Sequence, residues 1–75
     1  MVYVQFYHKD LSGRLSEALG DRSVVILDGR NSEAEWITIA KQMCKKRKYL
    51  AWQIFKGESF QNSKALGALH LEGLE

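Results

Sequence analysis

The chain has 75 residues, of which 45% are hydrophobic and 27% are charged, and its formal net charge is +2. This composition is that of a folded chain rather than a disordered one, and the charge is too small to indicate a nucleic-acid partner by itself. A length of 75 residues predicts a single domain. We expect one domain over residues 1–73, and we assign no function to the closing Leu74-Glu75, a dipeptide that often remains at a cloning junction.

Cysteine content and hydropathy predict the cellular compartment. A lone Cys44 excludes a disulfide within the chain. No basic segment followed by an apolar segment opens the sequence, and the longest plainly aliphatic run, Val24–Leu27, is far too short to cross a membrane. We therefore expect a cytoplasmic protein that does not interact with membranes.

Residues 2–8 alternate between two kinds of side chain, which is the period-2 pattern of a strand. The first face carries Val2, Val4 and Phe6, and the second carries Tyr3, Gln5 and Tyr7. The following segment, 10–20, has two interpretations. Its apolar spacing favours a short helix, whereas its Gly20-Asp21 pair also suits a tight turn that would pair 16–19 with the next strand. We favour the helix.

Residues 23–27 are apolar on both faces and precede an Asp28-Gly29 turn, which predicts a covered or central strand. The helix signals follow in residues 31–48. Ser32 and Glu35 have capping-box spacing, acidic residues occupy the first turn, and basic residues occupy the last. The apolar stripe of this helix comprises Trp36, Ala40, Met43 and Cys44.

Residues 49–56 alternate again and predict a third strand, which Gly57 ends. From Ser59 onward the pattern weakens, and the apolar residues of this tail suit either a short helix or an added edge strand. The sequence thus predicts a small α+β domain with about three strands, one dominant amphipathic helix packed on one sheet face, and a semi-ordered C-terminal tail.

Few residues could carry catalysis. The candidates are His8, His70, Cys44, Asp10, Asp21 and Asp28. None has the spacing of a metal site, a phosphate-binding loop or a nucleophile motif. If the strands at 2–8 and 23–27 were parallel, His8, Asp10, Asp28 and Arg30 would meet at one sheet edge, although such residues are more often solvated loop residues. We predict no catalytic residue, no metal site and no cofactor.

Two surfaces are candidates for binding. Lys41, Lys45 and Lys48 share one helical stripe, which favours a solvated face that compensates the helix dipole over a phosphate-binding ridge. Opposite the helix, the sheet would expose Tyr3, Tyr7, Tyr49 and Phe55. Such an aromatic face can pack under another segment, form a dimer or stack unpaired bases.

These features favour a non-enzymatic protein that binds a protein partner or a second copy of itself through the aromatic sheet face. The alternative is a nucleic-acid-binding accessory protein that uses the lysine-rich helix end together with the sheet aromatics.

Overall fold

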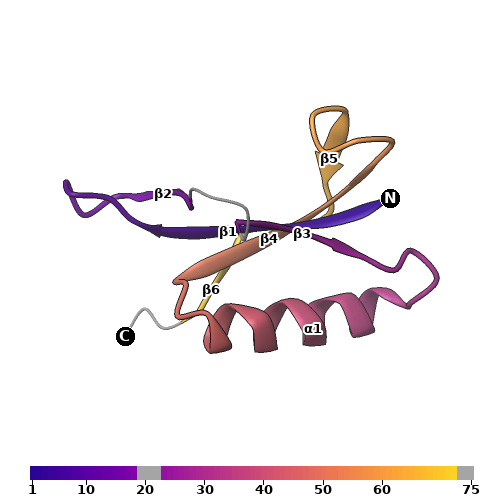
Figure 1. Cartoon of the computed structure of the whole chain (residues 1–75), viewed down its shortest axis with the longest axis horizontal. Helices are drawn as coiled ribbons and strands as arrows, with labels where there is room; N and C mark the ends of the chain where they lie inside the picture. Colours follow the sequence, from indigo (N-terminus) through magenta and orange to yellow (C-terminus); the bar gives the residue numbers. More distant parts are fainter. Residues whose placement is uncertain (19–22, 73–75) are drawn as a thin grey trace.

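The computed structural model describes residues 1–18 and 23–72, which form a mostly antiparallel sheet that curls like a half-barrel beside one helix (Figure 1). The described elements are β1 (Val2–Lys9), β2 (Leu15–Glu17), β3 (Val24–Leu27), α1 (Glu33–Lys46), β4 (Ala51–Gly57), β5 (Ser63–Ala65) and β6 (His70–Leu71). The helix lies along one side of the sheet, and the β4–β5 hairpin rises on the other.

The predicted fold of about three strands under a dominant helix is therefore wrong. The error lies in β2, β5 and β6, which contain only two or three residues each. Segments this short have no measurable period, and they are strands only because a longer neighbour supplies their hydrogen-bond partners. The three longer strands overlap the three segments that the sequence predicts as strands.

Strand β1 is the centre of the sheet. One of its edges pairs with β4, and its other edge pairs with β2 near Tyr7 and with β3 between Val2 and Gln5. Strand β4 carries β5 and β6 on its far side. Every one of these pairings is antiparallel, so the sheet is built from hairpins and from the single crossover through α1.

Strands β2 and β3 meet at Phe6, because both ends of the connecting segment bond to this one residue. The Ala18 amide donates to the Phe6 carbonyl, and the Phe6 amide donates to the Ser23 carbonyl, each at 2.9 Å. Gln5, only 3% exposed, reinforces the junction by donating from Nε2 to the same two carbonyls. The hydropathy pattern does not predict the burial of this side-chain amide, because it treats Gln5 as a surface residue.

Both predictions for 10–20 are wrong over residues 10–18, and residues 19 and 20 lie outside the described part. A turn replaces the helix because the Asp10 carboxylate accepts the amides of Ser12 and Arg14 at 2.9 and 3.0 Å. Gly13 adopts a φ of +83°, which a glycine tolerates at no steric cost. The turn directs residues 15–17 back along β1 instead of toward β3.

The capping box of α1 is confirmed. The Glu35 amide donates to Ser32 Oγ at 3.2 Å, and the Ser32 amide donates to the Glu35 carboxylate at 3.0 Å. Glu33 and Glu35 lie in the first turn, and Lys45 and Lys46 lie in the last, where each sign complements the helix dipole.

Ser32→Ala should therefore lower the free energy of unfolding by about 0.5–2 kcal/mol, because one amide of the first turn loses its acceptor. Ser32→Thr is the matched control, since threonine keeps the side-chain oxygen that accepts from the first turn. The urea midpoint, compared at constant slope, measures both effects. Equal midpoints for the alanine variant and the parent would show that the cap contributes nothing.

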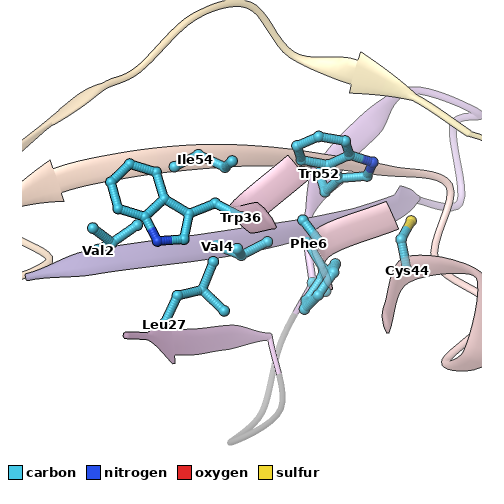
Figure 2. Packing of buried hydrophobic residues seen from close by; sticks show 10 residues of the cluster. Val2, Val4, Phe6, Leu27, Trp36, Cys44, Trp52 and Ile54 are labelled. Atoms are coloured by element: carbon cyan, nitrogen blue, oxygen red, sulfur yellow. The ribbon is translucent and has the colours of Figure 1, made fainter. Parts of the chain in front are cut away.

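The core lies between α1 and the facing side of β1, β3 and β4 (Figure 2). Trp36 is buried there, as the apolar stripe of the helix predicts, and Trp52 of β4 is buried as well. The Trp36 indole projects from the helix toward Val2, Val4 and Leu27, and its Nε1 donates to the Asp28 carbonyl at 2.8 Å. That bond ties the start of the helix to the end of β3.

The C-terminal tail follows the edge-strand alternative, and the short helix is wrong. Strand β5 pairs with the end of β4, while β6 pairs with its beginning and stacks His70 on Trp52 with ring centroids 4.1 Å apart. Between them, the Leu66 amide donates to the Ile54 carbonyl at 2.7 Å. The tail is thus anchored along the whole length of β4.

Candidate interaction surface

The predicted aromatic face is only partly assembled. Tyr3, Tyr7 and Phe55 lie on the sheet side away from α1, because they alternate with the core residues of β1 and β4. Tyr49 does not join them. It precedes β4, and its ring stacks on Phe6 on the helix side at 5.0 Å with an angle of 14°. The period-2 pattern extends to Tyr49 in the sequence, but the turn after the helix places it outside the strand.

Phe60, in the β4–β5 loop, covers this face. Its ring makes edge contacts with Tyr3 and Phe55 at centroid distances of 5.8 and 5.4 Å. Tyr3 is consequently only 6% exposed, so it belongs to a small second core and cannot form an open interface. The sequence carries only one signal of this role of Phe60, a single aromatic residue within a loop.

Tyr7 is also engaged within the chain. Its hydroxyl donates to Gln53 Oε1 at 3.3 Å, and Gln53 Nε2 donates to the Gly67 carbonyl at 3.2 Å. Partial burial raises the pKa of Tyr7, with a further contribution from the nearby Glu17 carboxylate. The side chains of the predicted aromatic surface therefore already make contacts within the chain.

The edge of β3 exposes a large apolar side chain. Ile26 is 60% exposed although it lies within a strand. It stands opposite Tyr3, so its side chain lies on the face away from α1. The expectation of a covered or central strand is wrong here, because the apolar pattern of β3 reflects core packing on one face only.

Hydrogen-bond alternation determines which backbone groups of β3 are unpaired. The Phe6 amide donates to the Ser23 carbonyl, so the backbone N–H and C=O groups of Val4 and Val2 also point toward β3. There they oppose Val25 and Leu27. The N–H and C=O groups of the intervening Val24 and Ile26 must then point away from β1. Within residues 1–18 and 23–72, no strand pairs with that side of β3.

The other edges of the described sheet carry features that discourage pairing. Strand β5 has three residues and an exposed Lys64, β6 has two residues, and β2 ends in the exposed Glu17. Short length and charge are the usual protections of an edge strand. Strand β3 has neither a charge nor a proline between Val24 and Leu27, so it is the least protected edge.

The basic residues do not form the predicted stripe. Lys41 and Lys45 are exposed on α1, but Lys48 lies beyond the helix end, in the left-handed region with a φ of +62°. The cavity at this end, of about 560 Å³, is lined instead by Lys46 and Arg47 together with Met43 and Tyr49. The Arg47 guanidinium lies 5.9 Å from the Phe6 ring centroid, which draws it toward the core.

The acidic and histidine candidates are not brought together. Because β1 and β3 are antiparallel, His8 near the end of β1 and Asp10 just after it lie at the end of the sheet opposite to Asp28 and Arg30. Hydrogen bonds from Ser12 and Arg14 lower the pKa of Asp10, and those from Arg30 lower the pKa of Asp28. Both carboxylates thus stabilise their own loops. The predicted candidate Asp21 lies outside the described residues.

Cys44 is a buried core residue, as its place on the helix stripe predicts. Its thiol donates to the Tyr49 carbonyl at 3.3 Å. Burial, followed by the charge of Glu72, raises the pKa of the Cys44 thiol to about 11, so the thiolate is scarce at neutral pH. In residues 1–18 and 23–72, no three His, Cys, Asp or Glu side chains cluster closely enough to hold a metal ion.

No protein-family model, curated protein or solved structure matches this chain. Among the described residues, no helix has the length and apolar character needed to span a membrane.

Proposed function

We propose that this chain is a non-enzymatic cytoplasmic interaction protein that binds an extended protein segment by adding it to the open edge of β3. The observation that carries the proposal is the combination of an exposed Ile26 with outward backbone groups at Val24 and Ile26. In strand addition, main-chain hydrogen bonds supply affinity, and alternate side chains supply specificity.

The alternative, a nucleic-acid-binding protein, has weaker support. The predicted stripe is reduced to Lys41 and Lys45, and Tyr3 is buried beneath Phe60 where it cannot stack on a base. A few exposed lysines attract phosphates weakly at physiological salt. The edge of β3, by contrast, offers directional hydrogen bonds next to exposed apolar surface.

A soluble peptide of alternating valine and threonine, flanked by lysines, tests the proposal in dilute protein. We expect it to shift the amide NMR signals of Val24 and Ile26 and to slow their hydrogen exchange, because these amides gain acceptors. The amides of Val25 and Leu27, which face β1, should change less. Unchanged Val24 and Ile26 signals at the highest peptide concentration would contradict strand addition.

Proline variants distinguish a loss of hydrogen bonding at the open edge of β3 from a loss of folding. Ile26→Pro removes an outward donor and should weaken peptide binding at least about tenfold while the domain stays folded, since proline is tolerated where an edge N–H faces solvent. Ile26→Thr keeps this N–H but loses the apolar side chain, and it should bind better than the proline variant. Val25→Pro, which removes a donor to β1, should instead destabilise the sheet.

A further inference from the structure

We propose that the cavity at the C-terminal end of α1 binds a small aromatic anion, which is a planar ring that carries a carboxylate or a phosphate. The cavity has a volume of about 560 Å³, and Met43, Lys46, Arg47 and Tyr49 line it. This volume lies within the roughly 300–1,000 Å³ that is usual for small-molecule sites. The inference goes beyond strand addition at β3, because none of these four residues belongs to that strand.

The end of α1, just before the chain turns into β4, brings two cations to the cavity (Figure 1). Met43, Lys46 and Arg47 have the i, i+3, i+4 spacing that places side chains on one surface of a helix. The described lining residues include no carboxylate, so the two positive charges set the sign of the local potential. An anion is therefore the favoured ligand.

The helix end does not use up the charge of Lys46. The backbone amides of residues 47, 48 and 49 donate to the carbonyls of residues 43, 45 and 44 at 2.9, 3.2 and 3.0 Å, so the last carbonyls of α1 are capped by the main chain. Within the described part of the chain, Lys46 has no carboxylate partner. The helix dipole opposes an anion with about half a negative charge, which is less than the two full positive charges.

Tyr49 supplies an aromatic wall whose position is already fixed. Its ring stacks on Phe6 with centroids 5.0 Å apart and an angle of 14° between the planes. The Arg47 guanidinium lies 5.9 Å from the centroid of the same Phe6 ring. Phe6 is fully buried, so the core positions both side chains. A site that exists before the ligand arrives binds at a lower entropic cost.

Met43 and Tyr49 favour a ligand with a ring over a bare anion. A methionine thioether makes favourable contacts with aromatic rings, and a tyrosine ring stacks on a second ring. Inorganic phosphate would use neither surface, and an exposed lysine by itself attracts phosphate only weakly at physiological salt. The apolar wall and the cations together therefore match a ring that carries one anionic group.

Phenyl phosphate and benzoate are the probes, and NMR signals of the parent chain report their binding. We expect the Met43 methyl and the Tyr49 ring signals to shift saturably. The methyl signal of Met1, the other methionine of the chain, should not move, because Met1 is bonded to Gly57 at the start of β1. Absence of a saturable Met43 shift with both probes, up to their solubility limits, would overturn the proposal.

The two halves of the ligand are tested separately. Inorganic phosphate and phenol, at the same ionic strength, should each bind at least about threefold more weakly than phenyl phosphate, because each lacks one half of the contacts. Inorganic phosphate as strong as phenyl phosphate would show that the ring contributes nothing and would overturn the aromatic ligand. Tighter binding of benzoate would assign the site to carboxylates, and tighter binding of phenyl phosphate would assign it to phosphates; both results support the proposal.

Lys46→Gln should weaken phenyl phosphate binding about three- to tenfold, because the ligand loses one charged contact. Lys45→Gln is the matched control: it makes the same change of charge one residue away, at a position that is not among the lining residues, and should alter binding by less than about twofold. Both side chains are exposed, so both variants should fold. Equal weakening by the two variants would mean that the whole helix end attracts the anion and would overturn the site.

Tyr49→Leu should abolish the preference for phenyl phosphate over inorganic phosphate, whereas Tyr49→Phe, which keeps the ring, should retain it. Tyr49→Leu also loses the stack on Phe6 and could unfold the chain. In that case the comparison of Lys46→Gln with Lys45→Gln remains decisive. A folded Tyr49→Leu variant that keeps the full preference for phenyl phosphate would overturn the assigned wall.

Discussion

Trp36→Ala should lower the free energy of unfolding by about 3–5 kcal/mol, the usual cost of removing a buried tryptophan. The side chain contributes twice to the fold. Its ring fills the space between α1 and the β1–β3 pair, and its Nε1 donates to the Asp28 carbonyl at 2.8 Å, which holds the turn after β3 against the helix. A domain of this size has a total stability of about 4–11 kcal/mol, so the variant should lose much of its stability.

Trp36→Phe is the matched control, because it keeps an aromatic ring in the core but has no donor for Asp28. We expect a loss of about 1–2 kcal/mol, composed of the hydrogen bond and a smaller cavity. Urea unfolding of the three proteins provides the comparison. A cooperative transition of Trp36→Ala near the parent midpoint would show that this indole is not central to the core.

Gly57→Ala should cost about 1–3 kcal/mol or more through overpacking at the β4–β5 turn. A Cβ atom at residue 57 would collide with the Asn62 carbonyl oxygen and would lie 2.6 Å from the Ser63 Cα. Both obstacles are backbone, so no side-chain rotation relieves them. Gly57 also exchanges backbone hydrogen bonds with Met1, at 2.7 and 3.0 Å, so a shift here reaches the start of β1.

Gly29→Ala controls for the general effect of replacing a glycine, because a Cβ there meets nothing within 4 Å. Its urea midpoint should stay close to that of the parent. The Gly57 variant should also release Phe60 from Tyr3 and Phe55, which faster hydrogen exchange in 63–65 would report. Equal midpoints for the Gly57 and Gly29 variants would refute the steric argument.

The proposed edge and the predicted aromatic face differ in what sequence patterns can reveal. Tyr3 is a poor interface residue because Phe60 arrives from 57 positions away in the chain and covers it. Ile26 stays exposed because β3 is the last strand on its side within the described residues. Neither property can be found in the local alternation of apolar and polar residues, since exposure depends on which segments pack nearby.

Local chemistry determined several features of this protein by itself. The capping box at Ser32, the Trp36 stripe, the burial of Cys44 and the alternation in β1 all depend on spacings within one segment, and each is present in the structure. Helix caps and amphipathic periods act over a few residues, so they survive whatever the rest of the chain does.

Only the tertiary structure decided the rest. Strands β2, β5 and β6 exist because β1 and β4 supply partners for their backbone groups, and the short Leu15–Glu17 segment becomes a strand although its composition suggests a helix. The antiparallel relation of β1 and β3 separates His8 from Asp28, and it leaves the groups of Val24 and Ile26 pointing outward. Pairing and edge position are long-range properties: they depend on which strand lies alongside, and the residues of a short strand do not specify its neighbour.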